Sequence, residues 1–228
     1  MKNIAVLTGA GISAESGIKT FRDSDGLWEN YRVEEVASFD AWQKNKELVL
    51  EFYNQRRRQI LTCKPNDGHK ALVELEKKYN VTIVTQNVDD LHERAGSKNI
   101  LHLHGELLKA RSTKDDSLIY DWREDIKVGD KCEKGWQLRP HIVWFGEAVP
   151  MFDKAIPVFK KADIVLVVGT SLVVYPAAGL VNYANYTVTK YVVDPNRPTL
   201  YNVENVEFVV KPATTGVREI VDRLLEEA

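Results

Sequence analysis

Short runs of apolar, often β-branched residues alternate along the chain with longer amphipathic segments. Six such runs predict strands, at residues 4–7, 81–84, 142–145, 164–168, 190–193 and 206–210. Most are apolar at every position, which is typical of strands buried on both faces of a parallel sheet. Residues 66–79 and 215–226 repeat apolar side chains at helical spacing. This alternation predicts an α/β fold, an open parallel sheet with helices on both faces.

Two segments interrupt the alternation. Residues 33–61 have a helical pattern throughout, whereas residues 112–138 are polar, charged and poorly periodic. We expect both to be insertions that together form a small lobe. The chain is then a single domain, residues 1–228, with a large lobe of residues 1–32, 66–111 and 139–228 and a small lobe of residues 33–65 and 112–138.

The charge balance and the apolar segments exclude several classes of protein. The 228 residues carry a formal net charge of −2, which argues against a nucleic-acid-binding protein. The apolar run at residues 4–7 is too short for a signal-peptide core, and no run approaches the roughly 20 apolar residues of a membrane-spanning helix. We therefore expect a cytoplasmic protein that binds no membrane. Cys63 and Cys132 form no CxxC pair, which argues against a disulfide framework.

Four of the predicted strands run into loops of small and polar residues. These loops begin at Thr8, Thr85, Gly169 and Asp194. In open parallel sheets, ligands bind at the carboxyl ends of the strands. Four such loops at one edge predict a composite nucleotide site.

The first loop has the pattern G-x-G-x-x-A, with Gly9, Gly11 and Ala14 at its three defined positions. Small residues let the backbone approach a pyrophosphate, and the N–H groups at the next helix start face the anion. A tight strand-to-helix turn without a ligand would show the same pattern. The acidic residue that usually grips the adenine ribose is not clearly placed, because Glu29 lies in a segment that does not read as a strand end.

Longer motifs are more specific, and they resemble those of the sirtuin family of NAD-dependent protein deacylases. The matching blocks are residues 9–18, Thr20-Phe21-Arg22-Asp23, Gly26-Leu27-Trp28, residues 85–89, 102–106 and 138–147, and Gly169-Thr170-Ser171. They follow the family's order and span nearly the whole chain. The resemblance implies a Rossmann-like large lobe, NAD as cofactor and acylated-lysine proteins as substrates. It also implies a reaction in which the acyl oxygen attacks C1′ of the NAD ribose, nicotinamide leaves, and O-acyl-ADP-ribose forms.

The resemblance also assigns roles to single residues. His104 matches the catalytic histidine, and its ordinary pKa suits a general base near pH 7. His102 and His92 are alternative candidates, but the family's histidine directly precedes the glycine that matches Gly105, which selects His104. Asn87 and Asp89 match the residues that orient the nicotinamide carboxamide. The full set implied for NAD is Gly9, Ala10, Gly11, Ser13, Glu15, Thr20, Phe21, Arg22, Trp28, Gln86, Asn87, Asp89, Gly169, Thr170, Ser171, Val193, Asp194 and Ala213. The peptide segment is Val143, Trp144, Phe145, Gly146 and Glu147, along which a substrate would lie as an extended strand.

The choice of acyl group is suggested by Tyr53 and Arg56, three residues apart and therefore on one face of a helix. This pair resembles that of the sirtuin branch that removes succinyl, malonyl and glutaryl groups. A guanidinium and a phenol can bind a terminal carboxylate. The alternative is a solvated basic face, with Tyr53 packed inward.

A zinc site common in the family is expected to be absent. Its four cysteine positions correspond to Ser112, Asp115, Cys132 and Gly135. Structural zinc needs about four ligands and only one remains, so we expect no zinc. We expect the small lobe to be held by packing instead, with Tyr120, Trp122 and Trp136 as candidates.

Three other activities remain open from the residues alone. An NAD hydrolase or ADP-ribosyltransferase could use the same His104 and Asn87. A non-catalytic NAD or ADP-ribose sensor would not need them, and a dehydrogenase is suggested only by the glycine-rich loop. The sequence leaves the protein substrates and the oligomeric state undetermined.

Overall fold

The computed structural model describes residues 1–19, 27–28 and 31–228, without the side chains of residues 27 and 28. Among these residues, six strands form one parallel sheet in the order β11-β10-β9-β1-β4-β5. The strands are β1 (Asn3–Thr8), β4 (Asn80–Thr85), β5 (Ile100–His102), β9 (Ile164–Val168), β10 (Thr189–Val193) and β11 (Val206–Val209). The expected open parallel α/β sheet is therefore confirmed. The short strand β5 was not predicted.

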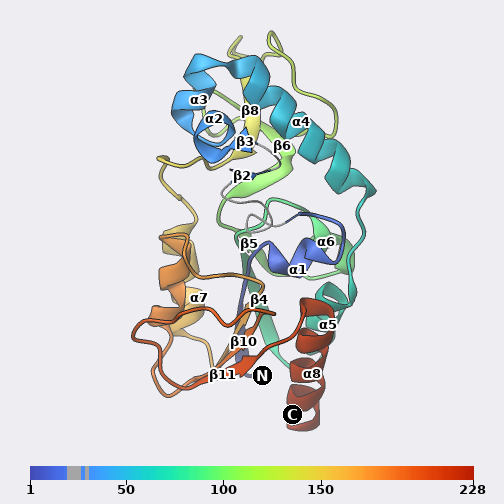
Figure 1. The fold of residues 1–228 in the computed structure, drawn as a ribbon, viewed down its shortest axis with the longest axis vertical. Helices are drawn as coiled ribbons and strands as arrows, with labels where there is room; N and C mark the ends of the chain where they lie inside the picture. Colours follow the sequence, from blue (N-terminus) through green and yellow to red (C-terminus); the bar gives the residue numbers. More distant parts are fainter. Residues whose placement is uncertain (20–26, 29–30) are drawn as a thin grey trace.

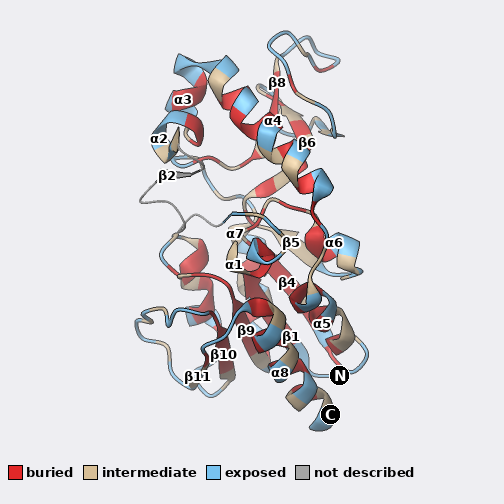
Figure 2. Ribbon diagram, turned by 45° about the vertical axis from the view of Figure 1, so that its right-hand side comes forward, coloured by how far each residue is buried: buried red, intermediate tan, exposed pale blue. Residues whose placement is uncertain are grey.

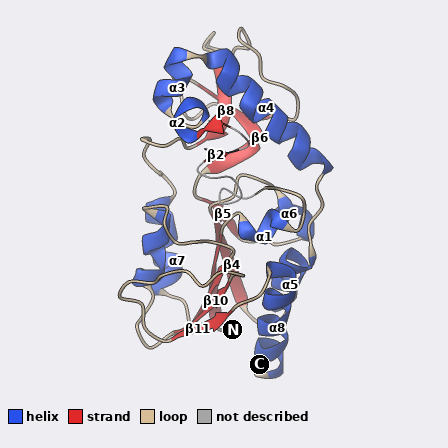
Figure 3. Cartoon of the chain, in the orientation of Figure 1, coloured by secondary structure: helices blue, strands red, loops and turns tan. Residues whose placement is uncertain are grey.

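Helices cover both faces of this sheet, which explains the uninterrupted apolar strands. Ile4 and Val6 of β1 pack in one cluster with α5 (Asp67–Leu75) and α8 (Ala213–Glu226). Ala5 and Leu7 pack in another with α7 (Phe152–Lys160) and the 3-10 helix η1 (Ala177–Tyr183). Figure 3 shows α5 and α8 on one side of the strands and α7 on the other, and Figure 2 shows the buried strands between them.

The strand order reverses between β1 and β9. The chain runs from β1 to β4 and β5 on one side, and then returns to β9 on the other side of β1. The short helices α1 (Gly11–Ala14) and α6 (Leu91–Ala95) follow β1 and β4. A reversal of this kind opens a crevice at the carboxyl ends of the strands. The four loops chosen from the sequence all lie at this edge, because β10, β9, β1 and β4 are consecutive neighbours.

The second lobe lies beyond this edge (Figure 1). It contains α2 (Val33–Val36), α3 (Phe39–Lys44), α4 (Lys46–Thr62) and a three-stranded sheet of order β7-β6-β8. The sheet strands are β6 (Gly105–Ser112), β7 (Ile119–Asp121) and β8 (Leu138–Ile142), and the ribbon β2 (Leu27–Trp28) with β3 (Tyr31–Arg32) adjoins the lobe. Residues 105–111 and 139–144 were expected in the large lobe, but Leu107, Ile142 and Trp144 pack in the cluster of the small lobe.

Two predictions of secondary structure were wrong in detail. Residues 33–61 form three helices rather than one, because Ser38 and Asn45 begin new helices with side-chain caps that accept from Ala41 N–H and Leu48 N–H. The strand expected at 142–145 ends at Ile142 and begins at Leu138. It pairs antiparallel with β6, outside the parallel sheet. Pro140 is tolerated there because β8 is an edge strand.

Within the described ranges, no helix combines the length and apolar character needed to cross a membrane.

Candidate active site

A cavity of about 570 Å³ lies between the carboxyl edge of the parallel sheet and the small lobe. Its walls are formed by the loops after β1, β4, β9 and β10, by α4, and by the segment that follows β8. This volume is in the range of small-molecule sites.

The glycines of the first loop are needed where it meets the loop after β9. Gly11 N–H donates to Gly169 O at 2.8 Å, and Gly9 N–H donates to Val168 O at 3.0 Å. A Cβ on Gly11 would lie 2.6 Å from Gly169 Cα, and one on Gly9 would lie 2.7 Å from Gly169 O. The glycine pattern thus lets two loops pack backbone against backbone along the cavity wall. This packing is a requirement of the fold, separate from any need to approach a phosphate.

His104 lines the cavity between β5 and β6. Its Nδ1 lies 3.0 Å from the backbone oxygen of Gln86, so this nitrogen carries the proton and Nε2 is left as an acceptor. Burial lowers the pKa of His104, and the bond to Gln86 only partly opposes this effect. The imidazole is therefore neutral at pH 7 and can accept a proton. Gly105 has φ +83°, and a Cβ there would lie 2.0 Å from His141 O, so only glycine can follow His104.

Asn87 and Asp89 are joined through Ser13. Ser13 Oγ donates to Asp89 Oδ2 at 2.9 Å and accepts from Asn87 Nδ2 at 3.2 Å. Asp89 Oδ1 also accepts from Leu91 N–H at 3.1 Å. Burial raises the pKa of Asp89, although these hydrogen bonds lower it. Ser13 is fully buried beneath the cavity, so it holds the Asn87 and Asp89 side chains rather than lining the wall.

The structure brings together most residues that the sequence proposed for the nucleotide. Those lining the cavity are Gly9, Ala10, Gly11, Glu15, Gln86, Asn87, Asp89, Gly169, Thr170, Ser171, Asp194 and Ala213. Ser13 and Val193 are buried behind the lining. Thr20, Phe21 and Arg22 lie outside the described residues. Trp28 belongs to β2, but its side chain is not among those described.

Glu15 and Gln86, which also line the cavity, bind groups on other loops. Glu15 accepts from the N–H and the hydroxyl of Thr214, at 3.0 and 2.7 Å, and so ties the first loop to the start of α8. Gln86 Nε2 donates to Thr170 Oγ1 at 3.1 Å. Both side chains therefore connect the loops to each other around the cavity.

The segment 143–147 lines the opposite wall. Its Val143 N–H donates to His104 O and its Phe145 N–H to Ala37 O, both at 2.9 Å. Trp144 N–H donates to the Glu147 carboxylate, and Glu147 N–H donates to Trp144 O. The backbone N–H groups of four of these five residues are therefore already used within the protein.

Arg139 organises this segment, although no role for it was expected from the sequence. Its guanidinium binds Glu147 through two hydrogen bonds, of 2.6 and 2.9 Å, and lies 3.3 Å from the ring centroid of Trp144. The Glu147 carboxylate also accepts from Trp144 N–H at 2.8 Å. Glu147 thus serves to fix the Trp144 turn. The only sequence signal for this pair is the spacing of eight residues between two opposite charges.

Tyr53 and Arg56 lie on the wall formed by α4. Tyr53 is buried between aromatic rings, 5.1 Å from Phe52 and 6.3 Å from Trp144 by ring centroids. Burial raises its pKa above the ordinary value, so the phenol stays neutral. The Arg56 guanidinium lies 4.1 Å from the ring centroid of Phe52, and its Nη1 donates to Phe52 O. Both parts of the proposed acyl pocket therefore reach the cavity.

The four positions of the family's zinc site do not fit a zinc ion. Ser112 Oγ accepts from the backbone N–H groups of Lys114 and Asp115, and from Cys132 Sγ at 3.5 Å. Asp115 binds Lys134 Nζ at 2.6 Å. Gly135 has no side chain to offer. The Lys134 ammonium group is therefore bound to Asp115, which is the one acidic side chain among these four residues.

The comparisons with known proteins agree with this geometry. A family model described as "Sir2 family" matches residues 9–176. The chain is 54% identical to the NAD-dependent protein deacylase of Helicobacter pylori strain 26695, with 100% of both chains covered. It is 51% identical to the protein of that name from Bacteroides thetaiotaomicron, with 99% of each covered.

Solved structures show the same likeness. A mutant Sir2 homologue in complex with ADP-ribose has a TM-score of 0.89 at 39% identity, covering 99% of this chain and 93% of that one. A Sir2 homologue in complex with NAD has a TM-score of 0.88, again at 39% identity, with 99% and 90% covered. The resemblance seen in the sequence motifs is confirmed: the chain belongs to the Sir2 family.

Proposed function

We propose that this Sir2-family chain, an NAD-dependent protein deacylase, moves the acyl group of an acylated lysine onto ADP-ribose, with His104 as the general base. The observation that carries the proposal is the state of His104. The imidazole is neutral, its Nδ1–H is held by Gln86 O, and it lines a cavity shared by both lobes. The products are nicotinamide, the free lysine and O-acyl-ADP-ribose.

The loops at the sheet edge are suited to hold NAD. The backbones of Gly9 and Gly11 form one wall, and Thr170, Ser171 and Asp194 add hydroxyl and carboxylate groups. Bound NAD supplies an activated ribose carbon from which nicotinamide departs. Paired donors and acceptors on one loop suit a carboxamide, so we assign Asn87 and Asp89 to orienting the nicotinamide group.

His104 would act after the acyl oxygen of the substrate has replaced nicotinamide at that ribose carbon. A base in this position takes the proton of a ribose hydroxyl, which can then react with the acyl carbon. Its lowered pKa keeps Nε2 unprotonated at neutral pH, and the bond to Gln86 fixes the ring. The acylated lysine would come from an extended peptide beside residues 143–147. In support, a Sir2 protein of TM-score 0.79 and 30% identity was solved with a deacetylated p53 peptide and 3′-O-acetyl ADP-ribose.

We assign acidic acyl groups, such as succinyl and malonyl, to the pocket of Tyr53 and Arg56. A neutral phenol donates one hydrogen bond and a guanidinium supplies a positive charge, which together match a terminal carboxylate. The carboxylate of Glu147 lines the same cavity, but Arg139 binds it through both oxygens. It therefore does not present an unpaired negative charge to an acidic acyl group.

The test is a panel of acetyl-, succinyl-, malonyl- and glutaryl-lysine peptides, with and without NAD, read by mass spectrometry. Arg56→Met should lower desuccinylation by about 10- to 100-fold, the loss expected for charge-assisted hydrogen bonds of about 1.5–3 kcal/mol. Deacetylation should change little. Arg58→Met is the matched control, since Arg58 is on the same helix but binds Glu51 and Asp125 away from the cavity.

Equal losses of both activities in Arg56→Met would overturn the pocket assignment. Nicotinamide released at the same rate without any peptide would instead indicate an NAD hydrolase, and reduction of NAD would indicate a dehydrogenase.

A further inference from the structure

Two histidines on one short stretch of chain hold consecutive carbonyl groups of the loop after β4. His104 Nδ1 lies 3.0 Å from Gln86 O, and His102 Nδ1 lies 3.1 Å from Asn87 O. The two rings therefore fix the two peptide groups that flank Asn87. His102 belongs to β5, in register with Thr85 of β4, which aims its ring along the loop.

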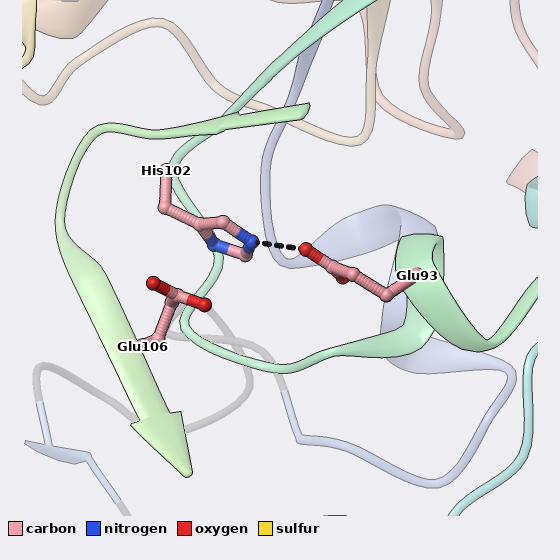
Figure 4. A group of neighbouring side chains, drawn as sticks. All are labelled: Glu93, His102 and Glu106. Atoms are coloured by element: carbon pink, nitrogen blue, oxygen red, sulfur yellow. Dashed lines mark hydrogen bonds and ion pairs between the residues drawn. The ribbon is translucent and has the colours of Figure 1, made fainter. Parts of the chain in front are cut away.

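The second nitrogen distinguishes the two rings. His102 Nε2 lies 2.7 Å from Glu93 Oε1 on α6 (Figure 4). His102 thus faces an acceptor at each nitrogen, a carbonyl and a carboxylate. A neutral imidazole donates from only one nitrogen, so both bonds are made only by the imidazolium form. The His102 side chain is only 9% exposed, whereas that of Glu93 is 40% exposed, so the ring is buried and the ion pair reaches water on the Glu93 side.

We propose that His102 is a positioning residue of the deacylase: as an imidazolium held by Glu93, it fixes the Asn87 carbonyl, and its deprotonation limits the reaction at alkaline pH. The proposal rests on the proposed function, because it takes Asn87 as the residue that orients nicotinamide.

Loss of the second proton has a defined consequence. The remaining proton goes to the stronger acceptor, and a carboxylate is a stronger acceptor than an amide carbonyl. Nε2 therefore keeps its bond to Glu93, and the Nδ1 lone pair then faces Asn87 O. Asn87 O thus loses its hydrogen-bond donor and is repelled by the Nδ1 lone pair. This repulsion acts beside the Asn87 side chain, which we assign to orienting nicotinamide.

The charges around His102 favour its protonated form. Burial opposes the positive charge, but the hydrogen bond and charge of Glu93, with the charge of Glu106 on β6, outweigh it and raise the pKa of His102. Glu106 is itself paired with Lys109 at 2.9 Å. The positive charge of His102 also acts on two buried neighbours. Burial raises the pKa of Asp89 and the charge of His102 opposes that rise, whereas burial lowers the pKa of His92 and the charge adds to that fall.

The same three side chains, Glu93, His102 and Glu106, are the one group of metal-type ligands among the described residues, with ligand atoms within 4.8 Å of one another. Their charges are already matched inside the protein, since Glu93 binds His102 and Glu106 binds Lys109. These side chains therefore form an ion-pair network behind the loop after β4.

The experiment measures peptide-dependent nicotinamide release from about pH 5 to about pH 10. The variants are His102→Leu, His102→Asn and Glu93→Gln, each checked for folding by thermal unfolding. His102→Leu should lower kcat/KM for NAD about tenfold, the value of one net hydrogen bond, with KM for the peptide little changed. His102→Asn keeps a neutral donor near the Nδ1 position and should restore most of the rate.

The alkaline limb of the profile is the decisive readout. In the parent protein it should follow the His102 titration measured by NMR of labelled imidazole, with a pKa above the ordinary 6.5. In Glu93→Gln the amide can donate to Nε2, so a neutral ring keeps its Nδ1 proton. Both Glu93→Gln and His102→Asn should therefore lose this limb while keeping the acid limb of His104.

The proposal is overturned if Glu93→Gln and His102→Asn both keep the alkaline limb of the parent protein. It is also overturned if His102→Leu folds and has the same kcat/KM for NAD as the parent protein. Absence of peptide-dependent release in the parent protein at every pH would instead refute the proposed function.

Discussion

His69 makes the stability of this protein sensitive to acid. The ring is fully buried at the start of α5, below the loop that carries Ser13. Its centroid lies 4.9 Å from that of His92, and Nε2 lies 3.5 Å from Ser13 Oγ. Burial, with a smaller contribution from the positive charge of Arg94, lowers the pKa of His69 to about 4.

The sign and the magnitude follow from this shift. The folded-state pKa is below the unfolded value, so the contribution to stability is complete above pH 6.5 and is lost as the pH falls towards 4. The difference between 6.5 and about 4 is 2.5 pKa units, which corresponds to about 3 kcal/mol. This is a large part of the roughly 5–15 kcal/mol that stabilises a typical domain. Burial lowers the pKa of His92 as well, so its effect has the same direction.

The assay is denaturant unfolding of the parent and of His69→Gln at pH 7.5 and about pH 4.5. Glutamine cannot titrate, so the variant should lose about 2–3 kcal/mol less than the parent between these two conditions. Carboxylates titrate in both proteins, and their effect cancels in the difference. Equal losses of unfolding free energy in the two proteins would refute the reasoning.

Two further predictions concern the loop packing and the small lobe. Gly11→Ala places a Cβ 2.6 Å from Gly169 Cα. Thermal unfolding should show a loss of about 1–3 kcal/mol, and calorimetry should show weaker NAD binding; an unchanged melting temperature would contradict the packing of these loops. Metal analysis of the purified chain should find well below one zinc per chain, and Lys134→Met should speed amide exchange in residues 112–138 by removing the partner of Asp115. Stoichiometric zinc, or parental exchange rates in the variant, would contradict this account of the lobe.

Much of the site could be predicted from local patterns. Apolar runs such as those of β1 and β9 show that both faces of a strand are buried, and this is enough to infer a parallel sheet. The carboxyl ends of parallel strands share one edge, so the loops at Thr8, Thr85, Gly169 and Asp194 could be placed together in advance. His104 was identified by its motif, and the residues of a motif are contiguous.

Other features depend on which segments meet. The sequence did not predict that β8 includes Pro140, because proline is tolerated in a strand only at the edge of a sheet. Only the sheet order shows that β8 is an edge strand. Ser13 meets Asp89 across 76 positions, and no local pattern reports such a pair. Arg139 binds Glu147, and the Glu147 carboxylate supports the Trp144 turn; its expected contact with the substrate stays a prediction.

The sequence by itself determined the fold class, the family and the edge of the sheet where the cavity lies, because these follow from burial periodicity and contiguous motifs. Only the tertiary structure decided the direction in which the pKa of His104, of His102 and of His69 shifts. A pKa depends on burial and on the charges that neighbouring segments bring close. Glu93 reaches His102 from another helix, and this contact exists only once the chain has folded.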